Sequence, residues 1–141
     1  MVQRSKRVRA IGGIFFRSRD PAKTREWYQR HLGLQTDSTG TNFAWRRADE
    51  SSRFGFSQWA PFPEDTAYFG ASDQQFMVNY RVDDLDTLLA GLRAEGVTIV
   101  GDVQLTPYGK FAHVVDIDGR RVELWEPVDS QYEKILDGVT K

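Results

Sequence analysis

Two stretches of the chain repeat one pattern of apolar and polar positions. Each has a short apolar segment that ends in an aromatic–arginine pair, followed by an acidic residue, an amphipathic stretch and a glycine. The pairs are Phe16-Arg17 and Tyr80-Arg81, so the copies are 64 positions apart in a chain of 141 residues. Similarity at this spacing predicts two equivalent supersecondary units in one domain. Units packed side by side leave a cleft between them, and ligands bind in clefts.

Each copy predicts one helix with an apolar face. The first begins at Asp20-Pro21, because aspartate accepts hydrogen bonds from the free amides and proline lacks only a donor that would be unpaired anyway. One of two adjacent aspartates caps the second helix, and Gly33 and Gly96 are suited to end the two helices. The positions that recur at helical spacing are Thr24, Trp27, Tyr28 and His31 in the first helix and Leu85, Leu88, Leu89 and Leu92 in the second.

Short apolar stretches around both helices predict strands. They lie at 10–18, 34–36, 42–46 and 53–59 in the first half. In the second half they are a stretch that ends at Tyr80-Arg81 and the stretches 97–100, 111–116 and 121–125. The Asp-Gly turn within 116–120 predicts a hairpin between the last two strands. Each half therefore has the predicted order β-α-β-β-β.

The predicted organisation is a single domain over residues 1–141. Module 1 covers about 9–60 and module 2 about 76–127, and a polar, proline-containing connector covers about 61–75. A capping-box pattern at 130–133 predicts a C-terminal helix over about 129–138.

Composition narrows the function classes. The net charge of −1 provides no overall attraction to nucleic acid or to an anionic membrane surface. No apolar stretch approaches the roughly 18 residues that cross a bilayer, and no signal-peptide pattern is present, so a soluble cytoplasmic protein is expected. The absence of cysteine excludes disulfides, thiolate catalysis and thiolate-bound zinc. The 18 aromatic residues suit a flat apolar ligand and equally suit a dense core.

Several motifs together resemble the vicinal oxygen chelate superfamily, which includes glyoxalases, bleomycin-resistance proteins and extradiol dioxygenases. The resemblance covers about residues 9–127, and its order and spacing carry it. It implies an α+β, glyoxalase-like fold, in which two tandem βαβββ modules form a curved mixed sheet, a half-barrel cup, with helices on the outer face. The motifs are Asp20-Pro21, Trp27-Tyr28, Leu32-Gly33-Leu34, residues 80–85 and residues 116–127.

The same resemblance implies four positions for metal ligands inside the cup. The ligand on the last strand corresponds to Glu123, a suitable oxygen donor. The other three correspond to Gly13, which has no side chain, to Met77, a soft thioether, and to a position around Ser57, a poor ligand. We therefore expect the metal site to be lost, no cofactor to be required, and a divalent metal to be disfavoured.

One candidate pair remains inside the predicted cup. A turn at 116–120 would place His113 opposite Glu123 on neighbouring strands, on the face away from the helices. A carboxylate beside a histidine fixes the imidazole tautomer and is a workable acid–base pair. The simpler interpretation is that the two side chains only satisfy each other's hydrogen bonds.

Further candidates for ligand binding follow from strand alternation. Arg17 and Arg81 end equivalent strands and are candidate anion clamps, although ion pairs with the caps Asp20 and Asp84 are the favoured alternative. Trp45, Phe56 and Trp59 can line the cup or pack in the core, and Tyr108 precedes the hairpin in a loop near the cup mouth. The complete set of expected ligand-binding residues is Phe15, Arg17, Trp45, Phe56, Ser57, Trp59, Met77, Asn79, Arg81 and Tyr108.

Three functions are consistent with these features. The first is a protein that binds a small aromatic or oxygen-rich molecule in its cup. The second is a metal-dependent or metal-free lyase, isomerase or dioxygenase, similar to lactoylglutathione lyase, with Glu123 and His113 as catalytic residues. The third is a resistance protein that sequesters a drug. Exposed sheet edges and the resemblance also favour a homodimer, with no nucleic-acid or membrane partner.

Overall fold

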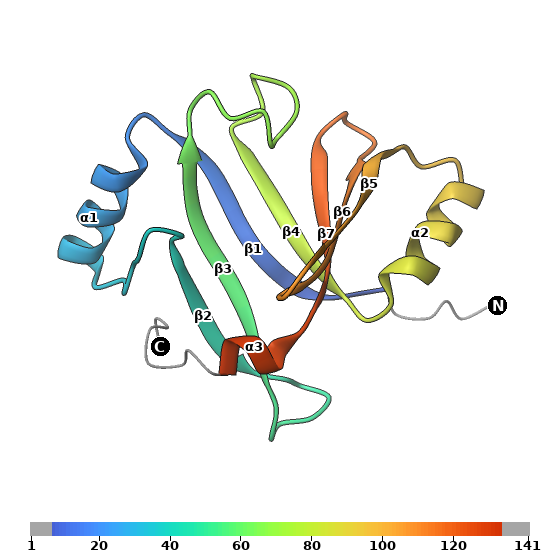
Figure 1. The fold of residues 1–141 in the computed structure, drawn as a ribbon, viewed down its shortest axis with the longest axis horizontal. Helices are drawn as coiled ribbons and strands as arrows, with labels where there is room; N and C mark the ends of the chain where they lie inside the picture. The colour runs from blue at the N-terminus through green and yellow to red at the C-terminus, as the bar shows by residue number, and fades with distance from the viewer. Residues whose placement is uncertain (1–6, 134–141) are drawn as a thin grey trace.

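The computed structural model describes residues 7–133, which form one seven-stranded sheet flanked by helices (Figure 1). No helix within this range is long and apolar enough to cross a membrane. The elements are β1 Val8–Ser18, α1 Pro21–Leu32, β2 Thr41–Arg46, β3 Phe54–Pro63, β4 Phe76–Val82, α2 Leu85–Ala94, β5 Ile99–Thr106, β6 Gly109–Val115, β7 Arg121–Pro127 and α3 Asp129–Glu133.

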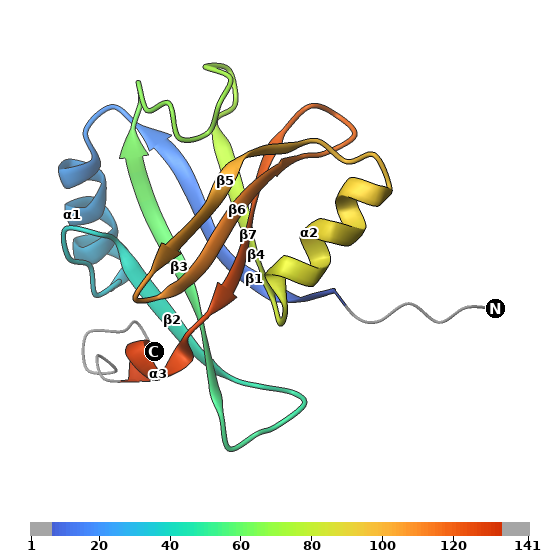
Figure 2. The same cartoon turned by 45° about the vertical axis from the view of Figure 1, so that its right-hand side comes forward.

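The sheet has the strand order β2-β3-β1-β4-β7-β6-β5. The two halves meet at the antiparallel pair β1–β4, and parallel pairs β1–β3 and β4–β7 lie on either side of it. The sheet curves so that β5 and β6 pass in front of the central strands, which leaves an open cup (Figure 2). Helices α1 and α2 lie at opposite ends, outside the cup (Figure 1). The predicted α+β, glyoxalase-like fold is confirmed.

The first half has one strand fewer than predicted. Residues 34–36 form no strand, and the only pairing near them is an isolated bridge between Asp37 and Gly40. In contrast, β3 continues into the predicted connector as far as Pro63. Prolines are tolerated there because β2 stops pairing at Trp59, which leaves the end of β3 with a neighbouring strand on one side only.

The hairpin register is confirmed. His113 pairs with Glu123, and the neighbouring pairs are Val114 with Val122 and Val115 with Arg121. Strand alternation then places His113 and Glu123 on the inner face of the sheet, because Val114 and Leu124 belong to the core under α2.

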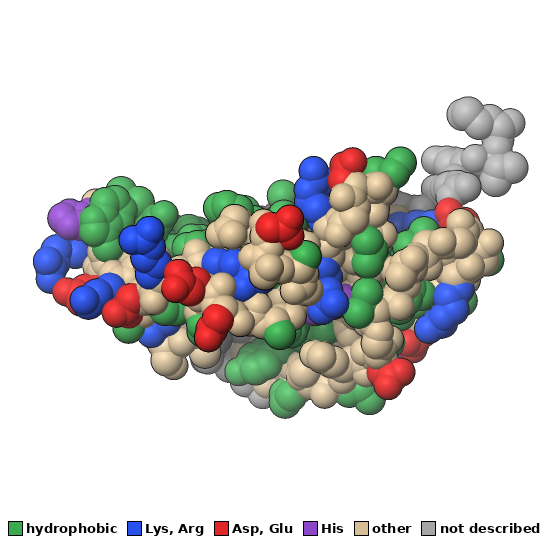
Figure 3. Space-filling view, turned by 90° about the horizontal axis from the view of Figure 1, so that it is seen from above, with side chains coloured by type: hydrophobic (Ala, Val, Ile, Leu, Met, Phe, Trp, Pro, Cys, Tyr) green, Lys and Arg blue, Asp and Glu red, His purple; other side chains and the backbone are tan. Residues whose placement is uncertain are grey.

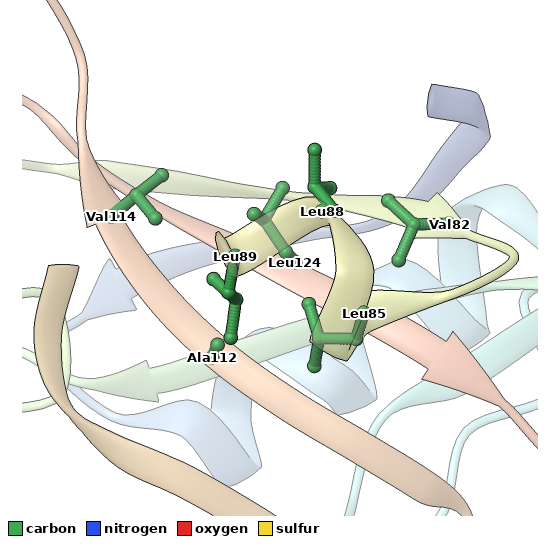
Figure 4. Packing of buried hydrophobic residues seen from close by; sticks show 7 residues of the cluster. All are labelled: Val82, Leu85, Leu88, Leu89, Ala112, Val114 and Leu124. Carbon is green, nitrogen blue, oxygen red and sulfur yellow. The ribbon is translucent and has the colours of Figure 1, made fainter. Parts of the chain in front are cut away.

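Helix α2 buries the main core. Its capping aspartate is Asp84, whose carboxylate accepts from the Thr87 amide. Figure 4 shows three of the four leucines of α2, Leu85, Leu88 and Leu89, beside apolar side chains of β4, β6 and β7. The cluster consists of Val82, Leu85, Leu88, Leu89, Ala112, Val114 and Leu124.

Helix α1 has the predicted ends but not the predicted burial. Asp20 caps its start, and Gly33 ends it in the left-handed region at φ 73°. None of its residues is buried, and Trp27, expected on the covered face, is 52% exposed. Only Tyr28 makes a close aromatic contact with the sheet, 4.7 Å between ring centres with Trp59.

The described part of the chain ends in helix α3. Helix α3 begins at Asp129 as predicted, while 134–138 of the predicted C-terminal helix lie outside the described residues.

Viewed from the connector end, basic and acidic side chains are interspersed and neither sign forms a continuous patch (Figure 3).

Candidate functional site

The centre of the cup is a buried carboxylate. Glu123 lies on β7, and the adjacent strands direct Asn79 and His113 toward the same face. Glu123 and Asn79 are each 1% exposed, and His113 is 8% exposed. A carboxylate taken so far out of water requires hydrogen-bond donors, and these neighbours provide them.

Three donors converge on Glu123. The Asn79 amide Nδ2 donates to Oε1 at 2.7 Å, and His113 Nε2 lies 2.9 Å from Oε2. The hydroxyl of Tyr68 also donates to Oε2. Because an ionised carboxylate only accepts, His113 donates to it from Nε2.

Tyr68 is a residue of the site that the sequence analysis did not identify. It lies in the connector, which folds back into the cup instead of passing outside it. Its ring stacks on Phe62, with centres 5.6 Å apart, and meets the His113 ring edge-on at 4.8 Å. Burial, and then the nearby negative charge of Glu123, raise the pKa of Tyr68 well above its ordinary value of about 10. Tyr68 therefore remains a neutral hydrogen-bond donor.

Arg17 fixes the connector in this position. Its guanidinium donates to four carbonyl oxygens, which belong to Gln74, Glu64, Thr66 and Ala71, at 2.8–3.2 Å. The expected ion pair with Asp20 is wrong, because Asp20 caps α1. Every carbonyl that Arg17 contacts lies on the connector, so Arg17 acts on the connector in this structure.

A second clamp joins the connector to β7. The Gln74 side chain exchanges two hydrogen bonds with the Arg121 backbone, each 2.8 Å long. Phe69, which has no exposed surface, packs with Phe15 and Met77 inside the cup. The connector therefore packs against β1 and β4 through Phe69 and presents the Tyr68 hydroxyl to Glu123.

Arg81 is part of the floor of the cup. It forms an ion pair with Asp129 at 2.5 Å and donates to the Phe56 carbonyl at 3.0 Å. Its guanidinium lies 5.1 Å from the Trp45 ring centre and 5.3 Å from that of Trp125. The expected ion pair with Asp84 is wrong, since Asp84 caps α2.

The remaining predicted residues do not form one group. Phe56 is fully buried against Trp125, whereas Trp59 packs on Tyr28 of α1 at the outer face. Trp45 Nε1 donates to Ser57 Oγ at 2.9 Å, which places Ser57 beside the indole. Tyr108 is 44% exposed at the turn between β5 and β6.

Two clefts adjoin the site, and Tyr68 and Phe111 line both of them. One, of about 380 Å³, also contacts Phe15, Phe62 and Glu123. The other, of about 530 Å³, contacts His113 and the start of β5. The pair Glu123–His113 is therefore bordered by a cleft on each side.

The sequence also matches a known family over most of its length. The sequence model of the "Glyoxalase/Bleomycin resistance protein/Dioxygenase superfamily" matches residues 10–124. The chain belongs to this superfamily. No curated protein is similar enough in sequence to be counted as a relative.

Solved structures share the superfamily fold with this chain. A methylmalonyl-CoA epimerase from Streptomyces coelicolor, in complex with 2-nitronate-propionyl-CoA, has a TM-score of 0.66 at 20% identity and covers 86% of this chain and 99% of its own. The methylmalonyl-CoA epimerase from Mycobacterium tuberculosis has a TM-score of 0.62 at 18% identity, over 94% of this chain and 97% of its own. At these identities the similarity describes the fold alone.

The superfamily's ligand positions in this chain do not fit a hard divalent cation. Met77 is fully buried among aromatic side chains, and Ser57 Oγ donates to the Ile11 carbonyl. A side chain at Gly13 would place its Cβ 2.9 Å from the Gln58 carbonyl oxygen. Within residues 7–133, no three His, Asp or Glu side chains are grouped to hold a metal. Glu123 alone is a suitable ligand.

Proposed function

We propose that this member of the superfamily binds a small aromatic or oxygen-rich molecule in its cup, without a divalent metal at the superfamily's ligand positions. The observation that supports this is the environment of Glu123. Its two oxygens accept from the Tyr68 hydroxyl, the Asn79 amide and the His113 imidazole. These donors stabilise the buried carboxylate in place of a cation.

The clefts beside Tyr68 favour a small organic ligand. Their lining combines aromatic rings with a few polar groups, which is the usual composition of small-molecule sites. Sequestration of a drug, as in bleomycin-resistance proteins, is one form of this function.

Acid–base catalysis is the second candidate, and one observation favours it. His113 Nε2 lies 2.9 Å from Glu123 Oε2, so a proton can pass between a bound molecule and this pair. A lyase, isomerase or dioxygenase of the superfamily would use Glu123 as the acid or base and His113 as its partner. The names of the structural neighbours, methylmalonyl-CoA epimerases, agree with proton transfer as a chemistry of the fold.

Two measurements test the proposal. Purified protein should contain well below one equivalent of zinc, nickel, manganese or iron by elemental analysis. A stoichiometric metal that is lost in Glu123→Ala would contradict the metal-free site. Second, a molecule that copurifies and is recovered unchanged after long incubation supports binding. Turnover that disappears in Glu123→Gln would establish catalysis instead.

A further inference from the structure

The smaller cleft has a distinctive lining. Its walls are largely apolar and come from β1, β3, β6, β7, the connector and residues 38–39. We call it the aromatic cleft, and its principal residues are Phe15, Gln58, Phe62, Tyr68, Phe111 and Glu123. Flat rings bind well between such walls, because offset-stacked and edge-on contacts add to the burial of apolar area.

The described lining of the aromatic cleft carries a negative charge and no basic side chain. Among the described residues that line it, Glu123 is the only charged side chain, and no Lys or Arg is present. Arg17 contacts the nearby connector, but its guanidinium is used by four carbonyl oxygens. An anion in this cleft would lie near a buried carboxylate without a cation to balance it.

Glu123 has acceptor capacity left for a ligand. Its two oxygens together offer about four lone-pair positions. Among the residues that the structure describes, Oε2 accepts from Tyr68 and His113, whereas Oε1 accepts from Asn79 alone. Oε1 therefore keeps a lone pair for one further N–H or O–H donor, and Glu123 lines the aromatic cleft.

We propose that the aromatic cleft selects planar aromatic molecules that carry an N–H or O–H donor and no anionic group, with Glu123 as the residue that rejects anions. This inference rests on the proposed binding function and specifies its ligand class. It separates this chain from a protein that binds a coenzyme A thioester, whose phosphates require cations. The larger cleft, lined by Arg121 and His113 together with Asp102, is the alternative place for an anion.

A matched series of three naphthalenes tests the charge selection. We would titrate 2-naphthylmethanol, 2-naphthylmethylamine and 2-naphthoic acid into the full chain and measure affinity by calorimetry and location by NMR. The alcohol and the amine should bind at least about tenfold more tightly than the acid, with shifts at Phe62, Tyr68 and Phe111. In Glu123→Gln the preference against the acid should fall at least about fivefold.

A second variant covers the case in which Glu123→Gln fails to fold. Gln58→Lys introduces a cation into the wall of the aromatic cleft, and it should raise the affinity for 2-naphthoic acid about tenfold. The matched control, Asp118→Asn, changes an exposed carboxylate in the turn between β6 and β7, which lines neither cleft, and should leave the order of the three affinities unchanged.

The outcomes separate the two proposals. Equal or tighter binding of the acid in the aromatic cleft would overturn the charge selection and leave the binding function intact. The same conclusion follows if Gln58→Lys does not improve binding of the acid. If none of the three compounds shifts any resonance of the cup, the binding function itself fails for aromatic ligands, and the selection fails with it.

Discussion

The two halves of the molecule share the order β-α-β-β, to which the second half adds one more strand, but they contribute differently. Helix α2 buries Leu85, Leu88 and Leu89 against the sheet, whereas no residue of α1 is buried. Sequence periodicity is present in both helices, so periodicity alone does not establish that a face is covered. The second half therefore provides most of the packing that stabilises the fold.

The same division applies to the site. The polar side chains around Glu123 come from β4, β6 and β7 of the second half and from the connector. The first half contributes space and apolar surface, through Gly12, Gly13 and Phe15 on β1. The second half and the connector thus hold the polar side chains around Glu123, and the first half lines the cleft with apolar surface.

The largest expected effect comes from replacing one leucine by alanine in each of the two helices. Leu85→Ala should lower the free energy of unfolding by about 3–5 kcal/mol, because Leu85 has no exposed surface and its removal leaves a cavity. Leu32→Ala in α1 should change it by less than about 0.5 kcal/mol, since Leu32 is 58% exposed. Urea denaturation measures both. Similar losses in the two variants would contradict the contrast between the halves.

The next largest effect concerns the attachment of the connector to the first half. Arg17→Gln removes most donors from four carbonyl oxygens and should lower the free energy of unfolding by about 2–3 kcal/mol. Relative to the wild-type chain, the exchange of backbone amides with solvent should then accelerate more in residues 64–75 than in β7. Arg19→Gln changes an exposed arginine two positions along and should leave both quantities unaltered. Unchanged exchange in Arg17→Gln would show that the connector is held by Phe69 and Gln74 instead.

Much of this architecture follows from local sequence signals. The Asp-Gly turn after β6 fixes the pairing of His113 with Glu123, because a tight turn determines the register of its two strands. The caps Asp20 and Asp84 likewise act within one helical turn of themselves. These features depend on residues close together in the chain, which is why a single sequence predicts them.

The parts that could not be predicted depend on distant contacts. Tyr68 reaches Glu123 across 55 positions of sequence, and Arg17 bonds to carbonyls 47 to 57 positions away. A polar connector with two prolines resembles a surface loop until those partners are known. The adjacent aromatic pair Tyr68-Phe69 was the one signal of burial within it.

Two glycine-to-alanine substitutions, one in each half, compare how closely the backbone of each half is packed. In Gly12→Ala the new Cβ would lie 2.2 Å from Asn79 Oδ1 and 2.9 Å from Trp125 Cε3, so we expect a loss of about 1–2 kcal/mol. Gly91→Ala in α2 meets only the flexible ends of the Arg7 and Glu95 side chains and should raise stability by up to about 1 kcal/mol. Thermal denaturation distinguishes these signs. A stabilised Gly12→Ala would mean that the site does not require this close approach.

A smaller effect should be visible only in alkaline solution. The folded state raises the pKa of Tyr68, so folding retains a proton that the unfolded chain releases above about pH 10. The stability from this group is complete below pH 10 and is lost as the pH rises further. Tyr68→Phe removes the titration, so the stability difference between the two proteins should shrink from pH 9 to pH 11 in urea melts. Parallel pH curves would contradict a buried Tyr68 hydroxyl beside Glu123.

The last prediction concerns the outer face of β1. A substitution there should have the smallest effect on the stability of the monomer and a large effect on the mass measured in solution. On this face Ile11 and Ile14 are 50% and 42% exposed, and Phe76 of the adjacent strand β4 is 60% exposed. A twofold dimer uses one patch twice, and a self-complementary apolar patch suits that symmetry. If the chain is a homodimer through this face, Ile14→Lys should halve the mass in light scattering and change monomer stability by less than about 0.5 kcal/mol. A dimer that survives the substitution must pair elsewhere, and a monomeric wild-type chain would leave this face of the first half as ordinary surface.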